Sequence, residues 1–175
     1  MKAVDFVLEA FAAVVAQTDA VLEIIGDGDL RGELEAQTAC LGIDSSVVFS
    51  GWLSQQQCAI KLQQADALVL RSLREGGGAV VLKAMAVALP VIATNWGGSG
   101  DYLNSRGGIL VKPASKEGFV NGLTDGMLKL AQPPELPQSM GSAGGERVRE
   151  HFDWERKVDR IVEIYQQSID TCPKP

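Results

Sequence analysis

The feature that most constrains the fold of this chain is a regular alternation between short apolar runs and segments with helical spacing. The apolar runs are rich in Val, Ile and Leu and read as buried parallel strands. They lie at 20–25, 47–49, 67–70, 90–93 and 108–111. Strands that alternate with helices, joined by right-handed crossovers, predict an α/β fold. We expect a doubly wound, Rossmann-like parallel sheet with helices on both faces.

Helical patterns fill the intervals between these runs. They are predicted at 4–15, 29–41, 54–64 and 78–89, from about 115, and at 154–169. Asp29 is a candidate N-cap, and Ser54 followed by Gln57 matches a capping box. The segment 132–138 carries three prolines and no capping residue, so it is predicted to be a surface connection.

Composition limits the classes of protein to which the chain can belong. Of its 175 residues, 46% are hydrophobic and 22% are charged, so it can bury a substantial core as one domain over 1–175, with 170–175 as a frayed tail. Its 16 Lys and Arg against 22 Asp and Glu give a net charge of −6. This charge argues against an extended nucleic-acid partner.

Neither membrane insertion nor metal binding is indicated. Asp5 and Glu9 interrupt the apolar N-terminal segment, and no apolar run approaches the roughly 20 residues that span a bilayer. Cys40, Cys58 and Cys172 lack metal-ligand spacing and are interpreted as reduced thiols. We expect a soluble, cytoplasmic protein without an integral membrane segment or a bound metal.

The segment from Ser72 to Gly78 is the main candidate binding element. It contains three successive glycines and lies between a predicted strand and a predicted helix, where this fold binds ligands. Free amides and the partial positive charge of the helix N-terminus would suit a phosphate or diphosphate. The alternative is a flexible turn that only allows tight packing.

Other polar features have structural alternatives of comparable weight. Lys83 is the only charged residue of the following helix, and it either contacts a ligand or simply reaches solvent. The glycines near Gly26 resemble a dinucleotide motif but carry acidic residues and Arg31, which argues against NAD. Gly97 and Gly98 favour a turn without a ligand, and the sole histidine, His151, is interpreted as a packing residue.

Several motifs together resemble the donor-binding C-terminal domain of the group 1 retaining nucleotide-sugar glycosyltransferases, which have the two-domain GT-B architecture. The similar segments are IIGDG at 24–28, VVFSG at 47–51, ADA at 65–67, SLREGGGAVVLKAMAVALPVIATNWGG at 72–98 and FDWERKVDRIVEIY at 152–165. They cover nearly the whole chain in the family's order. The longest segment is the most diagnostic.

The resemblance implies a role for each matching residue. Glu75 would be the catalytic residue that contacts the hydroxyls of the donor sugar. Lys2 would pair with the donor diphosphate, and the nucleotide base would dock beside Trp52 and Leu53. The remaining donor-binding positions are Ser72, Gly76, Gly77, Gly78, Ala79 and Lys83.

Three departures from the family pattern qualify this assignment. Lys83 replaces a glutamate that accepts hydrogen bonds from ribose, and an ammonium can only donate them. Gly77 stands where phenylalanine is usual. The family's N-terminal half is not represented, nor is the strand that normally precedes Lys2, which is central in the order 3-2-1-4-5-6. We therefore expect a sheet lacking its first central strand and self-association through the exposed edge.

The expected function is retaining sugar transfer from a UDP-, GDP- or ADP-sugar, with no cofactor beyond this donor. The expected partners are the nucleotide sugar and a separate acceptor-binding domain, without which the chain should be inactive. The alternative is a non-catalytic nucleotide-binding or interaction module that has kept the fold.

Overall fold

The computed structural model describes residues 4–70, 77–131 and 134–171. Its strands are β1 (Leu22–Ile25), β2 (Val47–Gly51), β3 (Leu68–Leu70), β4 (Val91–Thr94) and β5 (Gly108–Val111). Its α-helices are α1 (Val4–Val15), α2 (Arg31–Leu41), α3 (Gln55–Gln64), α4 (Ala79–Ala86), α5 (Gly98–Tyr102), α6 (Lys116–Leu130), α7 (Glu135–His151) and α8 (Trp154–Thr171). A short 3₁₀ helix, η1, spans Asp44–Ser46.

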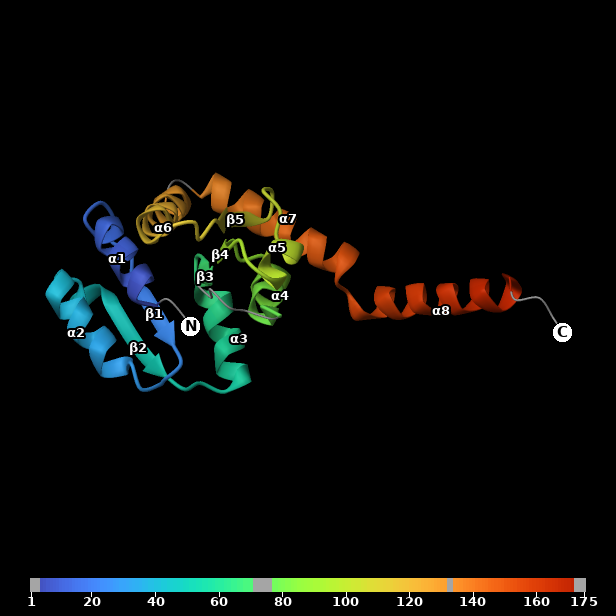
Figure 1. Ribbon diagram of the computed structural model, residues 1–175, viewed down its shortest axis with the longest axis horizontal. Coiled ribbons are helices and arrows are strands. Elements are labelled where there is room, and N and C mark those ends of the chain that lie inside the picture. Colours follow the sequence, from blue (N-terminus) through green and yellow to red (C-terminus); the bar gives the residue numbers. More distant parts are fainter. Residues whose placement is uncertain (1–3, 71–76, 132–133, 172–175) are drawn as a thin grey trace.

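The strands form two parallel sheets. One pairs β1 with β2, and the other has the order β3-β4-β5. In Figure 1 the strands follow one another across the molecule in the order β2, β1, β3, β4, β5. The predicted α/β fold with parallel strands is confirmed, and the strands are divided between two ladders.

Helices cover both faces of these strands, and β4 shows how. Along a strand, successive side chains point to opposite faces. Ile92 packs into the cluster formed with α1 and α6, whereas its neighbours Val91 and Ala93 pack into the cluster formed with α4. All four residues of β4 are buried, so this strand is the centre of the core.

Helix α1 follows its predicted amphipathic pattern closely. Its buried side chains recur at helical spacing, and the helix packs against α2 and α6. They are Val7, Leu8, Ala10, Phe11 and Val14. Two polar contacts add to this packing: Lys116 Nζ lies 2.7 Å from Glu9 Oε1, and the Thr124 hydroxyl donates to the Ala10 carbonyl at 3.2 Å.

Of the two helix N-caps predicted above, Ser54 and Asp29, the first is confirmed and the second is not. The Ser54 hydroxyl accepts from the Gln57 amide, and the Gln57 side chain accepts from the Ser54 amide, so the capping box of α3 is confirmed. The prediction for Asp29 was wrong, because α2 begins after Leu30 without a side-chain cap.

The prediction that 132–138 is only a connection was also wrong, because α7 begins within it at Glu135. Pro137 lies in the first turn, where amides have no helical partner, so its missing N–H costs nothing there. Gly141 allows α7 to approach the backbone of Ala88 closely: a Cβ at position 141 would lie 1.9 Å from the Ala88 carbonyl oxygen.

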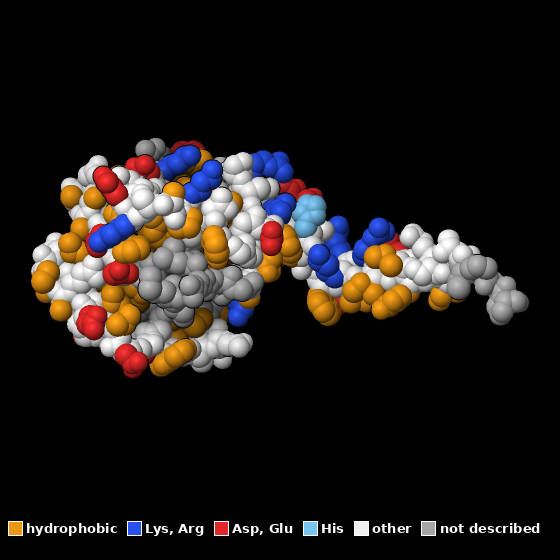
Figure 2. Space-filling model, in the orientation of Figure 1, with side chains coloured by type: hydrophobic (Ala, Val, Ile, Leu, Met, Phe, Trp, Pro, Cys, Tyr) orange, Lys and Arg blue, Asp and Glu red, His pale blue; other side chains and the backbone are white. Residues whose placement is uncertain are grey.

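Helix α8 extends away from the rest of the molecule and contains no buried residue (Figure 1). Figure 2 shows apolar side chains along one side of this helix. The exposed apolar residues of α8, all at least 40% exposed, are Trp154, Val158, Ile161, Val162, Ile164, Tyr165 and Ile169. In the described parts of the chain, no helix has both the length and the apolar character needed to cross a bilayer.

Candidate functional site

The carboxyl ends of the strands carry the residues with ligand-binding potential. In each parallel sheet the strands end at one edge, the usual ligand side of a doubly wound fold. There β1 leads into Gly26, β2 into Trp52, and β4 into Asn95. After β3, the next described residue is Gly77.

Four of the predicted site residues lie outside the described residues: Lys2, Ser72, Glu75 and Gly76. Gly77 is exposed, and Gly78 is the N-cap of α4, in the left-handed conformation with φ 56°. Such a φ strains residues that carry a Cβ, which explains a glycine at this position. The amides at the start of α4 therefore follow directly after the glycine turn.

Ala79 and Lys83 lie one helical turn apart on the exposed face of α4. The opposite face of the helix is buried through Val81, Ala84 and Met85. Lys83 thus reaches the surface on the same face as the first residue of the helix, as predicted for a lysine in an otherwise apolar segment.

The glycine turn packs against the turn that follows β4. A Cβ on Gly98 would lie 2.7 Å from the Gly77 carbonyl oxygen, so only glycine fits there without displacing the loop. Gly98 is the first residue of α5, a short helix that the sequence pattern did not reveal. Gly98 thus has a definite packing role beside the candidate phosphate loop.

Trp52 and Leu53 belong to the other sheet. They follow β2 directly and precede the cap of α3. The Trp52 side chain is 81% exposed, so a flat aromatic surface is open to solvent at this edge. Such a surface can stack on a planar ring.

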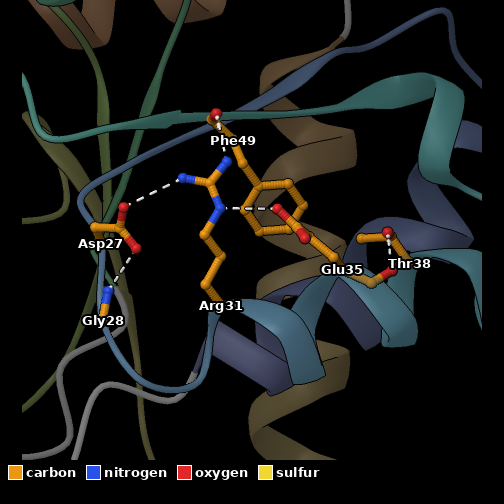
Figure 3. Close-up of polar contacts among 6 residues, drawn as sticks. All are labelled: Asp27, Gly28, Arg31, Glu35, Thr38 and Phe49. Carbon is orange, nitrogen blue, oxygen red and sulfur yellow. Dashed lines mark hydrogen bonds and ion pairs between the residues drawn. The ribbon is translucent and has the colours of Figure 1, made fainter.

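The turn after β1 is held by Arg31 (Figure 3). Arg31 Nε donates to Glu35 at 2.8 Å, Nη1 lies 3.3 Å from Asp27 Oδ2, and Nη2 donates to the Phe49 carbonyl at 3.4 Å. The guanidinium also lies over the Phe49 ring, 5.8 Å from its centroid. Arg31 thus joins the β1–α2 turn to β2.

Two further hydrogen bonds order this region: the Gly28 amide donates to Asp27 at 2.8 Å, and the Thr38 hydroxyl donates to the Glu35 carbonyl at 2.7 Å. The hydrogen bond from Arg31 to the Glu35 carboxylate raises the pKa of the guanidinium. Because two carboxylates already engage Arg31, the guanidinium is a structural clamp in this arrangement.

A hollow of about 460 Å³ lies between this turn and the start of α1, and its lining includes Val4, Gly26, Asp27 and Phe49. A second hollow, of about 480 Å³, lies near the amino ends of β3 and β4 and includes Asp66 and Pro90 in its lining. Only the first is at the carboxyl edge, where ligands bind in this fold.

Glu23 of β1 is the carboxylate whose ionisation is most clearly affected. Lys61 Nζ of α3 lies 2.8 Å from its Oε1, and the Ser50 hydroxyl of β2 donates to the same oxygen. These hydrogen bonds, led by that of Lys61, lower the pKa of Glu23. Across the described ranges, His, Cys, Asp and Glu side chains form no group of three suited to a metal ion.

Two residues that sequence reasoning did not single out, Thr94 and Arg147, order the backbone close to the glycine turn. The Thr94 hydroxyl, at the end of β4, donates to the carbonyl of Leu70, the last residue of β3, at 3.5 Å. Arg147 of α7 donates to the Tyr102 carbonyl at 2.6 Å and to that of Asp101 at 3.1 Å, so it holds the end of α5. The sequence signal that could have identified Thr94 is a threonine at the end of a strand predicted to be buried.

Comparison with known sequences identifies the same family that the sequence motifs resemble. The family described as Glycosyl transferases group 1 matches residues 1–127. N-acetyl-alpha-D-glucosaminyl L-malate synthase of Bacillus anthracis is 32% identical over 166 residues, which are 94% of this chain and 42% of that enzyme. The chain therefore spans less than half of this relative.

Solved structures show the same fold. The C-terminal domain of the group 1 family protein LpcC from Francisella tularensis has a TM-score of 0.77 at 25% identity, with 87% of this chain and 80% of that one covered. TarM of S. aureus, solved with UDP, has a TM-score of 0.80 at 22% identity, with 94% of this chain and 33% of TarM covered.

Proposed function

Because this chain belongs to the group 1 glycosyl transferases, we propose that it is the donor-binding part of such an enzyme and holds a nucleoside diphosphate sugar at its carboxyl edge. The observation that carries the proposal is the glycine turn at Gly77 and Gly78, which leads directly into the N-terminus of α4, where Ala79 is exposed. Its place in the chain, between a parallel strand and the helix that follows, is the ligand position of this fold.

The chemistry of the turn suits a diphosphate. The first amides of α4 have no helical acceptor, and the helix dipole places partial positive charge at the same point. Gly78 keeps the backbone free of a Cβ beside the phosphate oxygens. By resemblance, Lys2 would add a full positive charge and Glu75 would orient the sugar.

The proposed reaction is a retaining transfer. The bond between the anomeric carbon and the diphosphate oxygen breaks, a bond to an acceptor oxygen forms on the same face of the sugar, and the acceptor hydroxyl gives its proton to the leaving diphosphate. Negative charge develops on the leaving diphosphate, where the amides of the turn and of α4 would stabilise it. Holding the donor in one orientation contributes the rest of the rate enhancement.

We propose further that the isolated chain does not turn over. It spans 42% of the length of the Bacillus anthracis relative, and the resemblance assigns acceptor binding to a separate domain. Transfer of a radiolabelled sugar from its nucleotide by the purified 175-residue chain would contradict this part of the proposal.

Calorimetric titration with UDP, GDP and ADP tests donor binding. We expect one of the three to bind, and Ala79→Asp to weaken that binding at least tenfold. Ala79 is exposed in the first turn of α4, so a carboxylate there repels a diphosphate while favouring the helix dipole. The matched control is Gln138→Asp, which adds the same charge in the first turn of α7 and should leave affinity unchanged.

A second candidate function is a non-catalytic module that keeps the fold without a donor. Lys83 favours it, since this lysine stands where the family pattern has the ribose-binding glutamate. Absence of binding with all three nucleotides would favour the module over the donor domain. Equal effects of Ala79→Asp and Gln138→Asp would show that any binding occurs elsewhere.

A further inference from the structure

We propose that Trp96 holds the sugar of the bound donor, with the flat face of its indole stacked on the C–H groups of the sugar ring. This residue follows β4 at the carboxyl edge, and its side chain is 56% exposed. The inference rests on the proposed function, which places the donor diphosphate at the glycine turn. It adds a sugar-binding residue from a different turn.

The backbone on either side of Trp96 is held in place. The Asn95 amide donates to the Val111 carbonyl of β5 at 2.8 Å, and the Trp96 amide donates to the Thr94 carbonyl at 2.8 Å. Gly97 follows with φ 58° and ψ −147°, a conformation that residues with a Cβ rarely adopt. A fixed, tight turn therefore carries the exposed indole, so little backbone freedom is lost when a ligand packs on it.

This turn lies directly beside the glycine turn. β3 and β4 are neighbouring strands, with Leu70 opposite Ala93. Two residues after Trp96, Gly98 lies so close to Gly77 that a Cβ on Gly98 would be 2.7 Å from the Gly77 carbonyl oxygen. A group bonded to a diphosphate at the glycine turn is therefore within reach of Trp96.

The order of the strands indicates which part of the donor reaches Trp96. The turn after β4 contacts the glycine turn, whereas Trp52 follows β2, and β1 and β3 lie between these two strands (Figure 1). In a nucleoside diphosphate sugar, the sugar is bonded directly to the diphosphate, and the base lies one ribose further away. The nearer tryptophan thus suits the sugar, and the more distant one suits the base.

The chemistry of indole suits a sugar ring. A pyranose carries its hydroxyl groups around the rim and C–H groups on its faces, so one face can pack on a flat apolar surface while the hydroxyls keep polar partners. Tryptophan offers a large surface of this kind, and removing it from water is favourable. Trp96 should therefore add affinity for the sugar without contributing to the binding of the diphosphate.

Paired calorimetric titrations of the 175-residue chain test this assignment: UDP against UDP-glucose, GDP against GDP-mannose, and ADP against ADP-glucose. We expect Trp96→Ala to weaken binding of the nucleotide sugar about fivefold or more, and affinity for the matching diphosphate to stay within about twofold. Trp96→Phe keeps an aromatic face and should recover most of the loss. The matched control, Trp154→Ala, removes an indole that is 76% exposed in α8 and should change neither affinity.

Each of four results would overturn the inference. An equal loss for diphosphate and nucleotide sugar would assign Trp96 to the base or to the phosphates. Unchanged affinity of Trp96→Ala for a nucleotide sugar that wild type binds would leave the donor site in place without Trp96. A similar loss in Trp154→Ala would show a general effect of removing an indole. Absence of binding by wild type to every probe would overturn the proposed function together with this inference.

Discussion

Gly98 lies against Gly77, and a Cβ on Gly98 would stand 2.7 Å from the Gly77 carbonyl oxygen. Gly98→Ala must therefore displace the glycine turn or strain α5. We expect a loss of about 1 to 3 kcal/mol in the free energy of unfolding, the usual cost of overpacking. Urea denaturation measures it, and nucleotide affinity should fall in parallel because the turn moves.

Gly77→Ala is the matched control for this substitution. A Cβ on Gly77 would meet no atom within 4 Å, although the two glycines share one contact. The free energy of unfolding of the Gly77→Ala variant should stay within about 0.5 kcal/mol of wild type, as for surface substitutions in general. Equal destabilisation by both variants would contradict the close approach of the two turns.

Gly141→Ala should be the most destabilising glycine substitution in α7. Its Cβ would lie 1.9 Å from the Ala88 carbonyl oxygen, a backbone atom, and Ala88 already has a φ of 57°. We expect a loss of about 3 kcal/mol or more, seen as a lower Tm. Gly32→Ala in α2 faces open space and should stabilise by about 0.5 to 1 kcal/mol. A neutral Gly141→Ala would mean that α7 can move away from Ala88 freely.

Glu23 should make stability depend on pH in the acid range. Its pKa is lowered in the folded state from the ordinary value of 4.5, chiefly by the hydrogen bond with Lys61. A depressed carboxylate pKa adds stability that is present above 4.5 and is lost as pH falls through the folded pKa. We expect Glu23→Gln to cost about 1 kcal/mol at pH 7, since the pair is partly exposed.

Denaturation curves recorded at a series of pH values check this prediction. The free energies of unfolding of wild type and Glu23→Gln should become equal once the pH falls below the folded-state pKa of Glu23. Glu35→Gln is the comparison, because the Glu35 side chain is more exposed than that of Glu23, 48% against 29%, and pairs with Arg31 of the same helix. A constant difference between wild type and Glu23→Gln at every pH would show that the charge of Glu23 is irrelevant.

Lys83→Glu should strengthen nucleotide binding if Lys83 occupies the ribose position. The carboxylate would restore an acceptor for the ribose hydroxyls, worth about tenfold in affinity for one charged hydrogen bond. Lys129→Glu makes the same charge change at an exposed position of α6 and should have no such effect. Weaker binding by Lys83→Glu would instead indicate that Lys83 contacts a phosphate.

The fold was predictable where periodicity and burial agree. β4 and α1 are recognisable from a short apolar run and from apolar residues at helical spacing, because β4 is buried throughout and α1 buries one face. Helix α7 was missed because Pro137 and its glycines are poor helix formers. What stabilises α7 is close packing on Ala88, a tertiary contact that local propensity does not record.

The candidate site was predictable in its position and less so in its details. The glycine turn was assigned from its place between a strand and a helix, and Gly78 does cap α4. The role of Gly98 depends on a contact between two turns 21 residues apart, and the clamp formed by Arg31 depends on Phe49 of a different strand. Spacing along the chain carries no signal for such pairs.

The division of the strands between two ladders has a consequence for cooperativity. The β1–β2 ladder and the β3–β5 ladder are connected chiefly where α1 packs against α6. This contact includes the buried Leu8 side chain and the hydrogen bond from the Thr124 hydroxyl to the Ala10 carbonyl. Breaking that one helix interface leaves each ladder internally intact. Because side chains next to both ladders also pack in one core cluster, which includes Val47 and Ile92, we expect the two ladders to unfold together.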